Sequence, residues 1–200
     1  MVHLPALLER PSPFTWDDFV ALAEDDPREL VDGELMEIDV PTETHEHIGA
    51  LLIFFLVQWT RSGHAGRVLG SGYKVRISNK RGVMPDVQLY RRGNLPVGQD
   101  KGLVRGHPDL AVEILSSPSS RSFDRVKKLR WYAAIGVPEY WIIDPEAHTL
   151  ERLVFDGKNY VIEDSLGDDD VFEPASFAGL RIPLAELWVP PEPDELTPSP

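Results

Sequence analysis

Two short apolar runs constrain the fold most strongly: DLAVEIL at residues 109–115 and EYWIID at residues 139–144. Each has the length of a strand and is apolar on both faces, which is typical of a strand buried between two layers. The residues between them, from about Arg121 to Ile135, have the composition of a helix that ends at Gly136. The order strand, helix, strand predicts a βαβ unit with parallel strands and a helix covering one face of the sheet.

Turn and cap signals predict further elements on either side of this unit. In RELVDGELMEID an Asp-Gly pair separates two apolar stretches, which predicts a β-hairpin, and a short acidic helix is expected before it at residues 11–26. Thr44 is expected to cap a helix that runs to about Arg61. Other expected elements are strands at 67–70, 72–78 and 86–90 and a second hairpin around Asp156-Gly157. The chain is therefore predicted to be α/β (α+β mixed), with a mixed central sheet flanked by helices and an added N-terminal hairpin.

With 200 residues, 42% of them hydrophobic, the chain is long enough for one domain with a substantial core. We expect this domain at residues 15–189, after an N-terminal extension at 1–14 and before a disordered, proline-rich and acidic tail at 190–200. The absence of cysteine and of a signal-like start favours a cytoplasmic location. The most apolar window, residues 48–59, is shorter than the roughly 20 residues of a membrane helix, so we expect a core helix there and no membrane partner.

The net charge of −13 argues against a protein that binds nucleic acid without specificity. The charge is unevenly distributed, because residues 61–131 hold 15 of the 20 Lys and Arg but five of the 33 Asp and Glu. Such a basic block is usually a solvated surface. Since the block also contains the candidate chemistry, it could instead hold a phosphate backbone.

Glu113 lies within the apolar run at 109–115, where a buried strand would usually have another aliphatic residue. Alternate residues of a strand share a face, so Glu113 is expected on the face of Asp109, Ala111 and Leu115. A buried carboxylate is costly unless a cation or hydrogen-bond donors compensate it. We therefore expect a positive charge near Glu113. The purely structural alternatives are a salt bridge to an arginine or a strand end that reaches solvent.

Two further elements could bring polar groups to the same place. Asp86 follows a proline at the start of the predicted strand PDVQLY, although Pro-Asp is also a common turn pair. The helix FDRVKKLRWYAAIG contains Lys127 and Lys128, and if Val126 lies in its buried stripe, the two lysines lie at opposite edges of that stripe. Periodicity does not choose between them, and a simple surface ion pair of Lys128 with Asp124 is also open.

Two carboxylates and a lysine from neighbouring elements suit a hard-metal site for phosphodiester cleavage. Carboxylate and carbonyl oxygens are the ligands that Mg²⁺ or Mn²⁺ prefers, and such an ion polarises a phosphoryl oxygen and lowers the pKa of water. A lysine adds positive charge where the transition state becomes more negative. Asp86, Glu113 and one of the two lysines are therefore the candidate residues.

These segments resemble a known superfamily. The residues Pro85-Asp86, the strand with Glu113, and the stretch from Asp124 through Lys128 and Tyr132 to GVPEYWIIDP are similar to the PD-(D/E)XK, restriction-endonuclease-like superfamily. More narrowly, ELVDGEL, PTETHEHIGALL, MPDVQLY, HPDLAVEILSSPS and GVPEYWIIDP resemble, in this order, a family of small bacterial endonucleases formerly known as a domain of unknown function. The resemblance covers about residues 15–187 and implies a restriction-endonuclease-like αβββαβ core, a divalent-metal site, and DNA as the substrate.

By this resemblance Asp86 and Glu113 would bind the metal, together with the backbone carbonyl of Ile114, and a lysine would orient the attacking water. The sequence departs from the superfamily pattern at Leu115, where that pattern has lysine. In the narrower family the lysine lies in the following helix, and DRVKKLRWY favours Lys128. The hypothesis is a DNA endonuclease that uses Mg²⁺ or Mn²⁺, with Asp86, Glu113 and Lys128 as catalytic residues.

Other interpretations are open. A protein with this fold could be a catalytically silent module that binds nucleic acid or a protein partner, or a hydrolase of small phosphoesters. His45 is expected to cap its helix or contact substrate, because it matches the family segment, and its i, i+2 spacing from His47 does not suit a zinc site. Glu29 either faces the site or, in the favoured interpretation, only flanks the hairpin. Cleavage of both DNA strands would need a homodimer or successive nicks.

Overall fold

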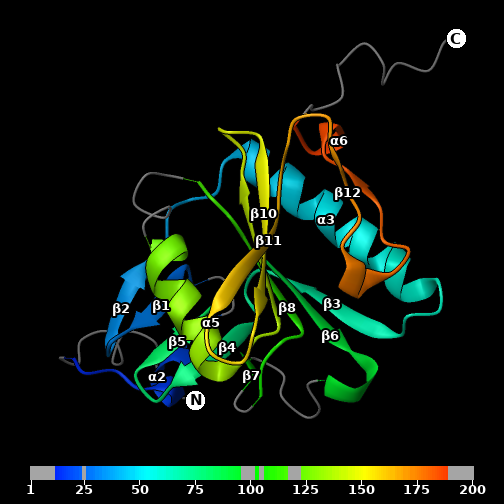
Figure 1. Ribbon diagram of the computed structural model, residues 1–200. Coiled ribbons are helices and arrows are strands. Elements are labelled where there is room, and N and C mark those ends of the chain that lie inside the picture. The colour runs from blue at the N-terminus through cyan, green and yellow to red at the C-terminus, as the bar shows by residue number, and fades with distance from the viewer. Residues whose placement is uncertain (1–11, 24–25, 96–101, 104–105, 117–122, 189–200) are drawn as a thin grey trace, which may run out of the picture.

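The computed structural model describes residues 12–23, 26–95, 102–103, 106–116 and 123–188 (Figure 1). Its larger sheet has six strands in the spatial order β11-β10-β9-β8-β6-β3. Their bounds are β3 Gly66–Gly70, β6 Val87–Arg91, β8 Leu110–Ile114, β9 Glu139–Asp144, β10 Thr149–Phe155 and β11 Tyr160–Gly167. The pair β8–β9 is parallel and the other neighbouring pairs are antiparallel. The predicted mixed sheet is therefore confirmed.

The two apolar runs form β8 and β9, and every residue of both strands is buried. The crossover between them consists of a π-helical segment, η2 (Phe123–Lys128), which continues into α5 (Leu129–Ile135). Gly136 ends α5 in the left-handed conformation, with φ 79°, as a C-terminal glycine commonly does. The predicted βαβ unit is confirmed, with the crossover helix irregular in its first part.

The smaller sheet has five strands in the order β2-β1-β5-β4-β7. Its strands are β1 Arg28–Val31, β2 Glu34–Glu37, β4 Lys74–Ser78, β5 Arg81–Val83 and β7 Gly102–Leu103. The β1–β2 hairpin turns at Asp32 and Gly33, whose φ angles of 53° and 90° are those of the predicted Asp-Gly turn. The sequence does not predict β5, because residues 79–82 have a turn-forming composition; pairing with both β1 and β4 forms the strand.

Helices cover both faces of the larger sheet, with α3 (Glu43–Arg61) on one face and α5 on the other (Figure 1). α3 ends at Arg61 as predicted, but the prediction of Thr44 as its cap is wrong. Thr42 is the N-cap, since its backbone is extended and its hydroxyl accepts the N–H of His45 at 3.2 Å. The remaining elements are α2 Trp16–Val20, η1 Arg92–Asn94, β12 Val171–Phe172, η3 Ala175–Phe177, β13 Ile182–Pro183 and α6 Ala185–Trp188. The helix expected at 11–26 is thus much shorter, at α2.

Alternate residues of β8 belong to two different cores. Leu110, Val112 and Ile114 pack on the α3 side. Ala111, together with Leu115 just beyond the strand, packs on the α5 side with Trp131 and other residues. Glu113 lies between Val112 and Ile114 in the strand, so its side chain points to the opposite face, the α5 side. This placement decides what it can contact.

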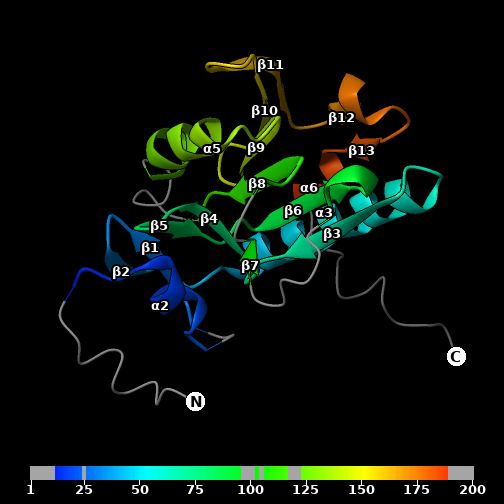
Figure 2. The same ribbon diagram turned by 90° about the horizontal axis from the view of Figure 1, so that it is seen from below.

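The smaller sheet and α2 lie together at one side of the molecule, and Figure 2 shows β4 next to the larger sheet. None of the helices in the described ranges combines the length and apolar character needed to cross a bilayer. Residues 1–11 and 189–200 lie outside the described part of the chain. The extension at 1–14, the domain limits at 15–189 and the tail at 190–200 therefore stay predictions.

Candidate active site

The register of β6 and β8 brings Asp86 and Glu113 together. Val87 pairs with Val112 in this antiparallel pair, so Asp86, which directly precedes β6, lies near the end of β8 that carries Glu113. The N–H of Ile114, the residue after Glu113, donates to Asp86 Oδ2 at 2.7 Å. Although 27 positions separate them in the sequence, the two carboxylates therefore come from neighbouring points of one sheet.

Backbone and side-chain donors both hold the Asp86 carboxylate. The N–H of Ile114 donates to Asp86 Oδ2 at 2.7 Å, and His45 Nε2 lies 3.3 Å from Asp86 Oδ1. His45 Nδ1 lies 3.5 Å from a carboxylate oxygen of Glu46, without the geometry of a hydrogen bond. Burial lowers the pKa of His45. The hydrogen bond with Asp86 and the negative charges of Asp86 and Glu46 raise it by more, so the pKa of the imidazole lies above its usual value.

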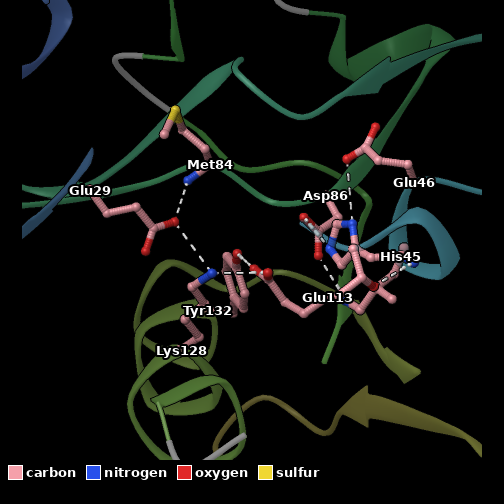
Figure 3. A network of polar contacts seen from close by, with 10 residues as sticks. Glu29, His45, Glu46, Met84, Asp86, Glu113, Lys128 and Tyr132 are labelled. Atoms are coloured by element: carbon pink, nitrogen blue, oxygen red, sulfur yellow. Dashed lines mark hydrogen bonds and ion pairs between the residues drawn. The ribbon is translucent and has the colours of Figure 1, made fainter. Parts of the chain in front are cut away.

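Glu113 is 2% exposed, and two side chains of the crossover helix donate to its carboxylate. Lys128 Nζ lies 2.9 Å from Oε2, and the Tyr132 hydroxyl donates to Oε1 at 2.5 Å (Figure 3). Burial and the adjacent carboxylate raise the pKa of Tyr132 well above its usual value, so the phenol stays protonated and keeps donating. The positive charge expected beside Glu113 is thus a lysine rather than an arginine.

The structure distinguishes the two adjacent lysines, which periodicity leaves equivalent. Lys128 is 6% exposed, whereas Lys127 is exposed and its ammonium lies 5.3 Å from the centre of the Phe123 ring. The expectation that Val126 lies in the buried stripe is wrong, since this residue is 47% exposed. The cause is η2, because a π-helix advances each residue by a smaller angle than an α-helix and so shifts the buried face.

The three predicted residues line one pocket of about 270 Å³. The acidic residues that line it are Glu29, Glu37, Asp39, Glu46, Asp86 and Glu113, and the basic ones, among the residues that the structure describes, are His45 and Lys128. Met36 and Ile38, which also line it, are 45% and 40% exposed. The negative charge of these carboxylates favours cations over phosphates at this surface until a cation is bound.

Among the described residues, the lysines and arginines of the basic block at residues 61–131 line this pocket at one position, Lys128. Several of its members have structural partners instead: Arg81 pairs with Asp32, Arg125 with Glu151, Arg91 donates to the carbonyl of Ser176, and Lys74 donates to the carbonyl of Phe19. Apart from Lys128, no lysine or arginine of the described ranges lines the pocket. That the block holds a phosphate backbone stays a prediction.

The donor set fits a hard divalent cation that retains water ligands. Within the described ranges no group of three or more His, Asp or Glu has the arrangement of a complete metal site. Mg²⁺, however, is usually held by one or two carboxylates and several waters. Asp86 and Glu113 supply two carboxylates, and the oxygens of each retain lone pairs beyond their present hydrogen bonds.

Sequence reasoning assigns no role to Tyr132 and favours the wrong one of two open interpretations of Glu29. Tyr132 lies in a segment that carries the family resemblance, but nothing in its pattern separates a buried hydrogen-bond donor from an ordinary core aromatic. Glu29 was expected to flank the hairpin, and instead its buried carboxylate contacts Lys128 at 3.3 Å. A charged residue at a buried position of a short strand was the available signal in that case.

Comparisons with known proteins agree with the geometry. The chain matches, over residues 16–185, the model of the Uma2 family, which is described as "Putative restriction endonuclease". It is also similar to a crystal structure of a "putative nuclease belonging to DUF820" from Anabaena variabilis ATCC 29413, with a TM-score of 0.70, 20% identity, and coverage of 88% of this chain and 98% of that one. None of the curated proteins matches. The structural likeness confirms the predicted nuclease fold.

Proposed function

The chain belongs to the Uma2 family, and from this premise we propose that it is a divalent-metal-dependent endonuclease that hydrolyses phosphodiester bonds in DNA. Membership in this family and the fold of the similar nuclease support the general class. The metal dependence, the use of Mg²⁺ or Mn²⁺ and the roles of individual residues rest on the chemistry of the pocket.

The single observation that carries the proposal is that Asp86, Glu113 and Lys128 line one pocket, with Lys128 on the Glu113 carboxylate. A structural salt bridge alone would need one carboxylate for one lysine. Here Glu113 and Glu29 share the one ammonium of Lys128, and Asp86, which is partly exposed and paired with His45, adds a third carboxylate to the same pocket. This excess of negative charge over Lys128 is favourable only where a further cation compensates it.

In the proposed site Asp86, Glu113 and the backbone carbonyl of Ile114 would hold the cation. When bound, such a cation supplies Lewis-acid stabilisation of phosphoryl oxygens and lowers the pKa of nearby water. Lys128 orients the attacking water and places a positive charge beside the phosphate as negative charge develops. Tyr132 fixes the Glu113 carboxylate, because its hydroxyl stays protonated and donates to Oε1.

The test is nicking of supercoiled plasmid by the purified protein with Mn²⁺ or Mg²⁺, and with the metal removed by a chelator. Asp86→Asn and Glu113→Gln keep the size of each side chain and remove its charge, so each should lower the nicking rate on the order of 100-fold or more. Glu34→Gln, an exposed carboxylate outside the pocket, is the matched control and should nick as the unaltered protein does.

Mn²⁺ calorimetry separates the endonuclease from the alternatives that the sequence leaves open. An endonuclease binds Mn²⁺, and the affinity is lost in Asp86→Asn. A silent module would show neither nicking nor Mn²⁺ affinity that depends on Asp86. A hydrolase of small phosphoesters would turn over a chromogenic phosphodiester and leave plasmid intact. Unchanged nicking in Asp86→Asn and Glu113→Gln would contradict the proposed roles.

A further inference from the structure

Glu29 is a buried carboxylate that lies outside the predicted metal and catalytic set. It comes from β1, in the N-terminal hairpin, and is 2% exposed. One oxygen, Oε1, accepts the backbone N–H of Met84 at 2.8 Å and lies 3.3 Å from Lys128 Nζ (Figure 3). A single atom therefore links the hairpin, the segment that leads into Asp86, and the crossover helix.

Lys128 has a demanding position, because it is the last residue of the π-helical segment. A lysine side chain has four rotatable bonds, and ordering it is costly. With Glu113 as its single partner, the ammonium could turn about one hydrogen bond. Glu29 supplies a second oxygen, so the nitrogen is held between Glu113 Oε2 at 2.9 Å and Glu29 Oε1 at 3.3 Å.

We propose that Glu29 is a positioning residue, which holds the Lys128 ammonium at the Glu113 carboxylate and so makes the N-terminal hairpin part of the active site. This inference rests on the proposed function for its consequence in catalysis. The positioning itself is a property of the free protein. The Met84 contact gives Glu29 a fixed anchor, since a backbone amide moves less than a side chain.

Two other roles for Glu29 predict different results. If Glu29 were a metal ligand, its substitution would lower the Mn²⁺ affinity of the protein. If it were a purely structural carboxylate, its substitution would change the melting temperature but neither the labelling of Lys128 nor the rate of nicking. Glu29→Gln suits all three measurements, because its amide oxygen can still accept the Met84 N–H while the negative charge that faces Lys128 is lost. Glu34→Gln, in the same hairpin but exposed, is the matched control.

The activity-independent measurement is the rate at which an amine-acylating reagent labels Lys128 in metal-free protein, followed by peptide mass spectrometry. Lys127, which is exposed, serves as the internal reference in the same peptide region. In the unaltered protein we expect Lys128 to be protected relative to Lys127. Glu29→Gln should raise the labelling of Lys128 severalfold and leave that of Lys127 unchanged. Glu29→Asp, which withdraws the charge by one methylene group, should give an intermediate rate.

In the nicking assay, Glu29→Gln should slow single-turnover cleavage on the order of 10- to 100-fold, with unchanged Mn²⁺ affinity. It should cause no further loss when combined with Lys128→Ala, because it acts through that lysine. Labelling of Lys128 that is the same in Glu29→Gln and the unaltered protein would overturn the proposal, as would a loss of Mn²⁺ affinity. If the unaltered protein did not nick DNA, the proposed function would fail while labelling still decided the positioning. If Glu29→Gln did not fold, Glu29→Asp would decide it in the same way.

Discussion

Replacing Lys128 with methionine should destabilise the protein far more than the same replacement of its neighbour Lys127. Lys128 is 6% exposed and is the shared cation of two buried carboxylates, Glu113 at 2.9 Å and Glu29 at 3.3 Å. Removing one partner of a buried ion pair costs about 3–5 kcal/mol, because the remaining charge is uncompensated. We expect Lys128→Met to lower the free energy of unfolding by about this amount, since methionine fills similar space and the lost charge dominates.

Lys127 provides the control, because it has the same chemistry one position away. Its side chain is exposed and contacts the face of Phe123. Exposed substitutions of this kind usually change stability by at most about 0.5 kcal/mol, and an exposed cation–π contact adds about 0.5–1 kcal/mol. Lys127→Met should therefore cost about 1.5 kcal/mol or less.

Urea unfolding in chelator-treated buffer, followed by circular dichroism, measures both variants against the unaltered protein. The slope of free energy against urea should be the same for all three proteins, so that the midpoints report stability alone. A loss of unfolding free energy in Lys128→Met that is no greater than the loss in Lys127→Met would refute the reasoning. This result would mean that the Lys128 ammonium does not compensate the buried carboxylates.

Two further predictions concern other ionic contacts. Arg152 is buried and contacts both carboxylate oxygens of Glu139 at 2.8 Å. Arg152→Met should lower the free energy of unfolding, measured by urea unfolding, by about 3–5 kcal/mol, and adding Glu139→Gln should recover part of the loss. The pKa of His45 is lowered by burial and raised by more by Asp86 and Glu46, so the stabilisation from its proton is complete below pH 6.5 and is lost as pH rises through the raised pKa. In metal-free buffer the stability difference between the unaltered protein and His45→Asn should therefore shrink as pH rises above 6.5 and through the raised pKa, and a difference that stays constant with pH would contradict this.

Local patterns predict the elements whose signals are complete within a few residues. The all-buried strands β8 and β9 have continuous apolar runs, and the hairpin at Asp32 and Gly33 has the turn residues that its positive φ angles require. The helical cap was misplaced by two residues, at Thr44 instead of Thr42, because both threonines can supply the same hydroxyl. Short-range chemistry thus determines these elements but not their ends.

The site itself was only partly predictable. Asp86 and Glu113 were identified from the sequence, but their proximity depends on the register of two strands, which no local pattern contains. The choice of Lys128 over Lys127 follows from the π-helical segment, whereas an α-helical period gives the two lysines equal positions. No local pattern reveals the contacts of Glu29 either, because its partners Met84 and Lys128 lie 55 and 99 positions away along the chain.

Leu115 explains why the ammonium of this site comes from a helix. The residue lies two positions after Glu113, on the same face, and is 2% exposed in the core that contains Trp131 and Tyr132. A lysine at this position would have to bury its charge among aromatic and aliphatic side chains, at a large cost in desolvation. Lys128 approaches the same carboxylate from the helix that covers this face, where Glu29 is also within reach. In this chain the ammonium beside Glu113 therefore comes from Lys128 of the covering helix, and the buried position 115 is occupied by an apolar residue.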